Sequence, residues 1–211
     1  MRPLIIFLFL LILFGCKKNE TPTLQDKLNN GVSVGELLHD HPVEAFIGKN
    51  GEGGIIFYLD TVNCVGLSAL AFDMPGTYEW GCTGLFISPG SWVSVYGLGA
   101  VNTAGIVDTC QTFGTAAEIC YNLDVEGFDD WYLPGADEAL EMNRQIGFGA
   151  SEHGLTGANQ NIGNFNGSHY WTSTQVSDIS AKAIEMDEYP TANYMYKVSM
   201  FRVRPIRIFS F

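Results

Sequence analysis

Asp130-Trp131-Tyr132-Leu133-Pro134 is a short, mostly apolar stretch that leads directly into a helical pattern over residues 136–146. Proline fixes its own φ and therefore favours a defined turn before the helix. Glu138 lies in the first helical turn, where the positive end of the helix dipole stabilises a carboxylate. We therefore predict a short strand or turn, a corner at Pro134 and a helix that stops at Gly147.

A hairpin is predicted upstream of this helix. Residues 55–59 read Ile-Ile-Phe-Tyr-Leu, an apolar run rich in strand formers that lies between Gly54 and Asp60. Such a short, bounded run indicates a buried strand rather than a helix. Residues 66–72 are its predicted partner in the hairpin.

Two more helices are predicted between the hairpin and Pro134. Asn102 is expected to begin one that runs to about residue 111. Thr115 begins the other, which ends near Leu123, because Glu118 follows Thr115 by three residues as in a capping box. The stretches 73–101 and 147–168 are rich in glycine and read as long irregular loops.

Strands dominate the C-terminal end of the chain. The predicted strands cover residues 170–173, 181–186, 194–198 and 201–209, and we expect them to form an antiparallel sheet. Because strands and helices do not alternate regularly, the predicted fold class is α+β. We expect a single domain with short antiparallel sheets, two to three helices and long irregular loops.

The N-terminus has the pattern of an exported lipoprotein. A single cation, Arg2, precedes an apolar run over residues 4–14, and Gly15 and Cys16 follow. The run is too short to cross a bilayer as a helix, and it fits a signal peptide over residues 1–15. We expect a lipid on Cys16, a tether over residues 16–23 and a short helical lead-in over residues 24–44. We therefore predict an outer membrane lipoprotein whose domain faces the periplasm or the cell surface. Its lipid makes the membrane a partner.

Charge and cysteine content restrict the possible ligands. The formal net charge of −12 opposes nucleic-acid binding, which requires neutralisation of phosphates. Four cysteines follow Cys16, and in an oxidising compartment they predict two disulfides whose connectivity stays open; they are Cys64, Cys82, Cys110 and Cys120. No cofactor is expected. A calcium site is weighed only at the loop carboxylates Glu126, Asp129 and Asp130, since calcium prefers oxygen ligands.

Four short signatures occur in a recognisable order along the chain. They are Gly53-Gly54-Ile55-Ile56-Phe57-Tyr58 with Trp80-Gly81-Cys82, then residues 130–134 with Asp137-Glu138, then Tyr170-Trp171-Thr172-Ser173-Thr174, and finally Val203-Arg204-Pro205-Ile206-Arg207. The ordered set resembles the Lcl C-terminal domain family, which occurs on collagen-like bacterial adhesins and exported lipoproteins. That family is similar to the C-type-lectin-like fold.

The resemblance implies a mixed α+β domain over residues 45–211 that is commonly a binding module. The signature residues are expected to hold the fold; they are Trp131, Leu133, Pro134, Glu138, Trp171, Ser173, Arg202, Arg204 and Arg207. An arginine among apolar residues needs a carboxylate partner. We therefore expect Arg202 or Arg204 to pair with Glu138 and to tie the last strand to the helix.

The predicted function is that of a non-catalytic binding or adhesion module that recognises glycans or proteins. Its candidate contact residues are aromatic, imidazole or amide side chains in the loops, namely Trp92, Tyr96, Asn164, Phe165, His169 and Tyr170. No catalytic residue is predicted, because the sequence has neither a nucleophile elbow around Ser173 nor a His-Glu-x-x-His pattern. Two alternatives stay open. A carbohydrate-active hydrolase would show converging carboxylates in a pocket, and a subunit of a surface assembly would show a large exposed apolar patch.

Overall fold

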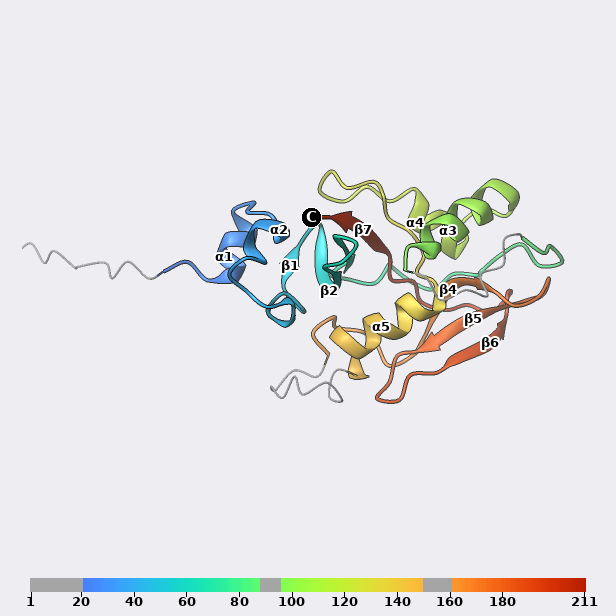
Figure 1. Ribbon diagram of the computed structural model, residues 1–211. Helices are drawn as coiled ribbons and strands as arrows, with labels where there is room; N and C mark the ends of the chain where they lie inside the picture. Colours follow the sequence, from blue (N-terminus) through green and yellow to red (C-terminus); the bar gives the residue numbers. More distant parts are fainter. Residues whose placement is uncertain (1–20, 88–95, 150–160) are drawn as a thin grey trace, which may run out of the picture.

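The computed structural model describes residues 21–87, 96–149 and 161–211, which form an α+β domain (Figure 1). Two antiparallel sheets make up its frame. The first has the order β1-β2-β3-β7, with strands β1 (Asn50–Gly51), β2 (Gly54–Asp60), β3 (Val65–Ala69) and β7 (Ile206–Ser210). The second has the order β4-β5-β6, with strands β4 (His169–Gln175), β5 (Ser180–Glu185) and β6 (Ala192–Tyr196). The predicted fold class is confirmed.

The helices are short and lie in two groups. The lead-in contains α1 (Leu24–Asn29), α2 (Val34–Leu37) and the 3₁₀ turn η1 (Val43–Ala45). After residue 45 the described chain forms α3 (Leu98–Thr109), α4 (Ala116–Tyr121) and α5 (Ala136–Ile146). Within the described ranges, no helix is both long and apolar enough to cross a membrane.

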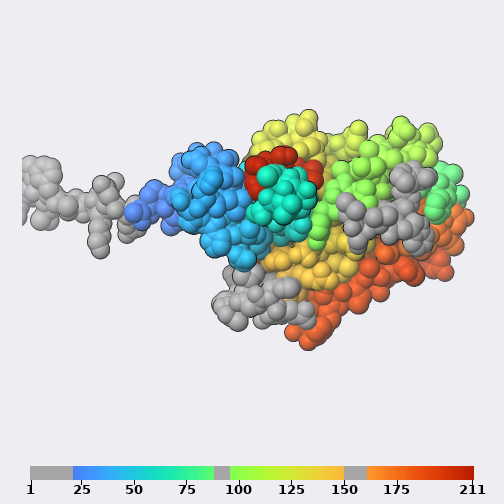
Figure 2. Space-filling view, in the orientation of Figure 1, coloured from blue at the N-terminus to red at the C-terminus, as the bar shows by residue number. Residues whose placement is uncertain are grey.

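Strand β2 is covered on both faces, which explains its unbroken apolar sequence. Ile55 and Phe57 belong to the central core, whereas Ile56 and Leu59 belong to a separate cluster. The lead-in residues Val34 and Leu37, together with Phe46, fill that second cluster and leave Ile56 fully buried. The predicted hairpin is confirmed, with Ile55 opposite Ala69. The lead-in therefore packs on the first sheet as part of the same folded unit (Figures 1 and 2).

Helix α5 joins the two sheets. Its bounds agree with the prediction, and Gly135 and Gly147 flank it. Ala139, Met142 and Ile146 are fully buried in the central core that both sheets share. Contacts to β2, β4 and β5 place this helix between the sheets (Figure 1).

Helix α3 begins at Leu98, five residues before the start that a cap at Asn102 predicts. Asn102 was expected to cap this helix, but it lies inside the helix and is buried. The residue before the helix is Gly97, whose φ is +93°, a conformation that glycine adopts without strain. The carboxylate of Glu138 accepts a hydrogen bond from the Gly97 N–H at 2.6 Å, so a side chain from α5 satisfies the start of α3. A cap supplied from 41 residues away leaves no local sequence signal.

Residues 201–209 do not form the single strand that the sequence pattern predicted. Phe201 makes only an isolated bridge with Tyr78, and Arg202 makes one with Tyr170. Pro205 lacks the N–H that a ladder requires, and regular pairing begins at the next residue. Strand β7 then joins β3 in the first sheet rather than β4, β5 and β6. The segment therefore crosses from one sheet to the other.

Arg204 is buried at this crossing, with 1% of its surface exposed. Its Nε and Nη2 atoms donate to Asp73 Oδ1 at 2.8 and 2.6 Å, and its Nη1 donates to the carbonyls of Leu70 and Gly163 at 3.0 and 2.8 Å. The guanidinium also lies over the Phe165 ring, 4.2 Å from its centroid. Burial of a charge is tolerated because these partners replace its water.

The predicted pairing of Arg202 or Arg204 with Glu138 is wrong. Arg202 also approaches Asp73, at 3.6 Å. Glu138 instead accepts hydrogen bonds from the N–H groups of Gly97 and Gly135 and from the Tyr132 hydroxyl. Burial raises the pKa of Glu138, although these hydrogen bonds oppose the shift. Its role is to hold the starts of α3 and α5 together.

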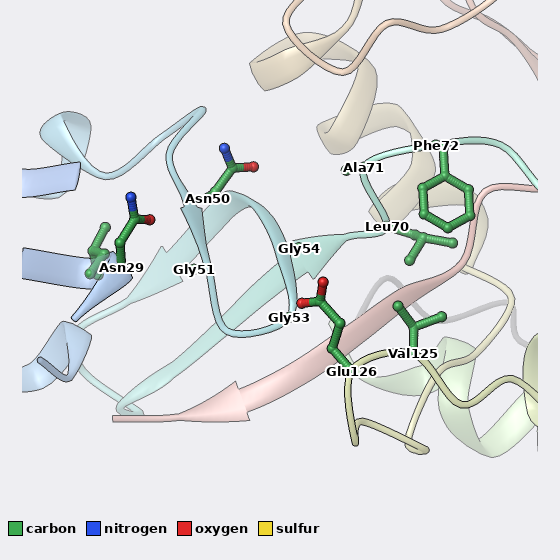
Figure 3. A pocket seen from close by; sticks show the side chains of 11 residues that line it. Asn29, Asn50, Gly51, Gly53, Gly54, Leu70, Ala71, Phe72, Val125 and Glu126 are labelled. Atoms are coloured by element: carbon green, nitrogen blue, oxygen red, sulfur yellow. The ribbon is translucent and has the colours of Figure 1, made fainter. Parts of the chain in front are cut away.

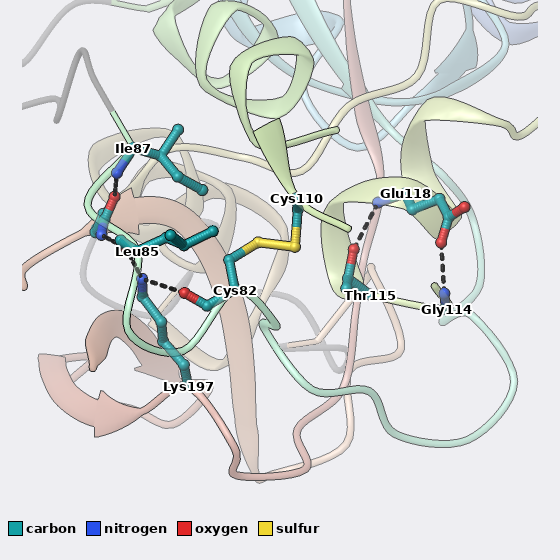
Figure 4. Close-up of a disulfide and its surroundings, with 9 residues drawn as sticks. Cys82, Leu85, Ile87, Cys110, Gly114, Thr115, Glu118 and Lys197 are labelled. Carbon is teal, nitrogen blue, oxygen red and sulfur yellow. Dashed lines mark hydrogen bonds between the residues drawn. A yellow bond between two sulfur atoms is a disulfide. The ribbon is translucent and has the colours of Figure 1, made fainter. Parts of the chain in front are cut away.

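The structure contains one disulfide among its described residues, between Cys82 and Cys110 (Figure 4). The expectation of two disulfides, with their connectivity open, is wrong, since Cys64 and Cys120 are free thiols. Cys64 is exposed in the turn between β2 and β3, whereas Cys120 is buried in α4 against the Trp80 cluster. Burial raises the pKa of the Cys120 thiol, which makes it unreactive.

This assignment predicts a thiol count. In the chain from residue 17 on, Ellman's reagent should label one thiol, Cys64, in the folded protein and two after denaturation without reductant. A Cys64→Ser variant should show none until it is unfolded. If the denatured, unreduced protein shows no free thiol, the chain has two disulfides and the assignment is wrong.

Candidate functional site

Two of the predicted contact residues belong to the core. Phe165 and Tyr170 are 4% and 1% exposed, and their rings meet edge to face at 5.7 Å. The Tyr170 hydroxyl donates to Asp73 Oδ2 at 2.6 Å and accepts from the Asn166 N–H at 2.9 Å. The prediction that these two rings contact a ligand is therefore wrong, because packing and the Asp73 network occupy them.

The other predicted contact residues that the structure describes, Tyr96, His169 and Asn164, each have different neighbours. Tyr96 stacks on Tyr58 at 4.1 Å, and His169 stacks on Phe201 at 5.1 Å. Asn164 is exposed, in a turn that hydrogen bonds back to Asn161. Trp92 and Cys16, the predicted site of lipidation, lie outside the described residues.

The signature residues other than Arg202 lie in the interior. Trp131, Leu133, Trp171 and Ser173 are at most 3% exposed. The Trp131 indole donates to the Phe128 carbonyl at 3.0 Å, and Ser173 N–H donates to the Pro134 carbonyl at 2.8 Å. These contacts agree with the expectation that the signature residues hold the fold.

The calcium candidate does not form a site. Asp130 uses both carboxylate oxygens to bind Arg207, at 2.6 and 2.9 Å. Within the described ranges, no three acidic, histidine or cysteine side chains are grouped as metal ligands. Glu126 and Asp129 are therefore not part of a cluster with Asp130.

A groove of about 340 Å³ lies where the lead-in meets the first sheet (Figure 3). Its walls come from the end of α1, the β1–β2 turn, the segment after β3 and a turn before Trp131. The lining residues are Leu28, Asn29, Asn50, Gly51, Gly53, Gly54, Leu70, Ala71, Phe72, Val125 and Glu126. Three of them are glycines, so a ligand there would touch backbone as well as side chains.

Two Glu-Gly turns border this groove. Glu52 and Gly53 connect β1 to β2 with φ of 51° and 79°. Glu126 and Gly127 have φ of 55° and 83°, and Val125 and Phe128 exchange two backbone hydrogen bonds across them. Positive φ at both central positions is the type I′ combination, which suits a two-residue hairpin. It is uncommon for glutamate, so tertiary contacts must hold these turns.

Arg207 holds both turns. Besides binding Asp130, its Nη1 donates to the carbonyl of Glu52 at 2.8 Å. Its guanidinium lies 4.2 Å from the centroid of the Phe128 ring. That ring fits against Gly53, where a Cβ atom would lie only 2.8 Å from it. The two turns are thus fixed relative to each other by a single side chain from β7.

The polar side chains of the groove are positioned from α1. Gln25 binds the backbone of Asn50 through the Asn50 N–H at 3.1 Å and the Asn50 carbonyl at 2.8 Å, and it donates to Asn29 Oδ1 at 2.8 Å. The side chains of Asn50 and Glu126 make no hydrogen bond to other described residues, and both residues are exposed. Phe72 is 52% exposed beside them. The groove therefore offers amide groups, one carboxylate and one aromatic ring to a ligand (Figure 3).

A second hollow, of about 590 Å³, lies between α2 and the last residue, Phe211. Leu38, Pro42 and Val43 make it largely apolar. The Nε2 atom of His41 has no hydrogen-bond partner, but it is closed off from solvent. His39, Thr61 and Cys64 add polar groups to its lining.

Perturbed titratable groups lie outside the groove. Burial lowers the pKa of Lys197 to about 8. Its Nζ donates to the carbonyls of Leu85 and Cys82 at 2.8 and 3.3 Å, next to the disulfide (Figure 4), and it lies over the Trp80 ring. Lys197, like Glu138, therefore has a structural explanation that needs no reaction.

Sequence reasoning missed the groove. It assigned ligand contacts to aromatic loops, whereas the groove uses the lead-in and the Glu-Gly turns. The dipeptides Glu52-Gly53 and Glu126-Gly127 were a readable turn signal. Their proximity depends on Arg207, which no local pattern predicts.

Comparisons with known proteins give a distant likeness. No family model matches the sequence, and no curated protein matches it. The crystal structure of a fimbrial protein from Bacteroides ovatus ATCC 8483 is similar with a TM-score of 0.43 and 14% sequence identity. The match covers 83% of this chain and 41% of that one, so this chain spans less than half the length of that protein. A likeness at this level assigns no function.

Replacing Arg207 by methionine tests its role at the groove. The change leaves Asp130 and the Glu52 carbonyl without their partner, so we expect the free energy of unfolding to fall by about 2–3 kcal/mol. Urea denaturation measures this loss. The control is Arg144→Met, which breaks an exposed ion pair with Glu141 and should cost less than about 0.5 kcal/mol. Equal losses in the two variants would contradict the role of Arg207.

Proposed function

We propose that this chain is a non-catalytic binding module that holds a short glycan in the groove beside α1 and is displayed from the bacterial envelope by a lipid on Cys16. The observation that carries the proposal is the set of side chains in the groove. An exposed ring, two amides and a single carboxylate line it together with glycine backbone. Sugars need this combination, because they present both apolar faces and many hydroxyl groups.

The size and depth of the groove suit a small ligand. Its volume of about 340 Å³ is at the lower end of the range for small-molecule sites. Phe72 offers a face on which an apolar sugar face can stack. The Asn50 amide and the Glu126 carboxylate can then bind hydroxyl groups without losing bonds within the protein.

The negative charge of the groove disfavours anionic glycans. Glu126 is its one charged lining residue, and the chain carries a net charge of −12. A sulfated or otherwise anionic sugar would be repelled by both. We therefore propose a neutral sugar or an amino sugar as the ligand, rather than a sulfated glycosaminoglycan.

The same groove disfavours the hydrolase alternative. Glycoside hydrolysis normally uses two carboxylates on opposite sides of the scissile bond. Glu126 is the only acidic residue in the lining. Elsewhere in the described chain, the buried carboxylate of Glu138 is committed to Gly97, Gly135 and Tyr132.

The anchor would keep this groove close to the membrane. The tether residues that follow Cys16, 17–23, span at most about 25 Å when fully extended. Helix α1 starts at Leu24, directly after the tether, and its last turn lines the groove. The binding groove would thus lie at the anchored end of the domain, where the lead-in forms one end of the molecule (Figure 2). Resemblance to the Lcl C-terminal domain family, which occurs on adhesins and exported lipoproteins, supports the same reading.

Binding to a glycan array tests the proposal. The chain from residue 17 on should bind a neutral or amino-sugar oligosaccharide and should not bind heparin. Phe72→Ala and Asn50→Ala should each weaken binding about tenfold, as loss of one stacking or hydrogen-bonding contact predicts.

The matched control is Phe113→Ala, because Phe113 is 90% exposed and does not line the groove. Its affinity should equal that of the wild type, and chelation of calcium should have no effect. Full affinity in Phe72→Ala, or no binding to any glycan on the array, would contradict the proposal.

A further inference from the structure

Strand β6 is a free edge of the second sheet. The strand order is β4-β5-β6, and within the described chain β6 pairs with β5 alone (Figure 1). At the opposite side of this sheet, β4 contacts the last segment through a bridge between Tyr170 and Arg202. Edge strands present unpaired N–H and C=O groups that another strand can bind.

The backbone register identifies which groups point outward. Lys197 N–H donates to the carbonyl of Ile179 at 3.0 Å, and Met195 lies opposite Ala181. In an antiparallel ladder, alternate residues bond to the same neighbour. The odd-numbered residues of β6 therefore face β5, and the backbone groups of Tyr194 and Tyr196 face the free side. The Tyr196 carbonyl also accepts the Ser199 N–H at 2.8 Å, so one lone pair of this oxygen is left for a second strand.

The side chains along this edge form an exposed stripe. Tyr194 and Tyr196 are 70% and 66% exposed. They are two apart on the strand and so lie on one face. Val198 and Met200, in and after the turn that follows β6, are 56% and 52% exposed. Tyr189, just before β6, is 69% exposed as well.

The edge lacks the features that normally block strand addition. Natural edges are protected by charged side chains, by proline or by bulges. Residues 189–200 contain no acidic residue, and their one proline, Pro190, precedes β6. Their one cation, Lys197, is fully buried against Trp80. In a chain with 23 acidic residues, an acid-free edge of this length is a distinct surface.

We propose that β6 pairs with β6 of a second copy of this chain, antiparallel, about a two-fold axis at Met195. In this register the outward groups of Tyr194 meet those of the second copy's Tyr196, and the reverse pair is identical by symmetry. The tyrosines of the two copies then lie next to each other across the junction. The two sheets become one six-stranded sheet, a common size.

Charge favours a second copy as the occupant. Two copies of a strongly acidic chain repel each other over most of their surfaces. A self-contact must therefore use a surface without carboxylates, and β6 provides one. The one charge of the strip, that of Lys197, is buried, so the exposed side chains offer nothing to attract a basic or an acidic peptide.

The size of the contact predicts a weak dimer. With 150–250 Å² per aromatic side chain, the exposed stripe offers roughly 500 Å² per copy, or about 1,000 Å² in total, at the lower limit for a specific interface. We expect a dissociation constant on the order of tens of micromolar. The inference does not rest on the groove, which belongs to the first sheet.

Sedimentation velocity on the chain from residue 17 on tests the proposal. All contacts described above lie within residues 21–211, so removal of the N-terminus leaves them intact. The wild type should shift from monomer to dimer as its concentration rises through about 10–100 μM. Tyr194→Lys combined with Tyr196→Lys should stay monomeric. The control Tyr121→Lys, on helix α4 and 50% exposed, should dimerise like the wild type.

A cross-link tests the register independently of those variants. At the two-fold axis the two copies of residue 195 form a non-hydrogen-bonded pair with Cα atoms about 4.5 Å apart, a distance that a disulfide can bridge. Met195→Cys in a Cys64→Ser background should give a disulfide-linked dimer under mild oxidation, whereas Tyr121→Cys in the same background should not. A wild type that stays monomeric, a dimer that survives the two lysine substitutions, or an uncross-linked Met195→Cys dimer would each overturn the proposal.

Discussion

The buried guanidinium of Arg204 is the contact on which the arrangement of the two sheets depends. It binds Asp73 and the carbonyl of Leu70, which come after β3 of the first sheet. It also binds the carbonyl of Gly163, which comes before β4 of the second sheet. Asp73 in turn accepts a hydrogen bond from the hydroxyl of Tyr170 on β4. A charge with 1% exposure cannot be hydrated, so loss of these partners strongly destabilises the fold. One arginine therefore fixes the loop after β3, the segment before β4 and the crossing between the sheets.

Arg207 holds the candidate site together in the same way, by binding a carboxylate and a backbone carbonyl from distant segments. Arg207 lies on β7 and binds Asp130 together with the carbonyl of Glu52, so the two Glu-Gly turns are held by the strand that closes the first sheet. The groove thus depends on the final residues of the chain as well as on the lead-in that forms its other wall. Lead-in, turns and last strand are far apart in sequence, yet they form one surface. The exposed edge of β6 belongs to the other sheet, so glycan binding and self-association would use separate parts of the molecule.

Local features were predictable from the sequence. The bounds of α5, the start of α4 at Thr115 and the buried strand β2 follow from capping, dipole and periodicity signals within a few residues. The failures concern contacts between distant segments. Pro205 indicates a break in a strand, but the sheet that the strand joins afterwards depends on β3. Arginine burial was predicted, whereas the choice of Asp73 over Glu138 depends on where α3 begins. Phe165 and Tyr170 were assigned to a ligand because aromatic residues in a polar loop look the same whether they pack inward or face solvent.

A double-mutant cycle between Arg204 and Asp73 tests the central claim most directly. The free energy of unfolding is measured by urea denaturation for the wild type, Arg204→Met, Asp73→Ala and the double variant. Removal of Asp73 alone should cost about 3–5 kcal/mol, because it leaves a buried charge unpaired. The double variant should recover part of that loss and give a coupling energy of at least about 2 kcal/mol. A coupling energy below about 0.5 kcal/mol would mean that the two residues act independently, and it would contradict the account of how the two sheets are held together.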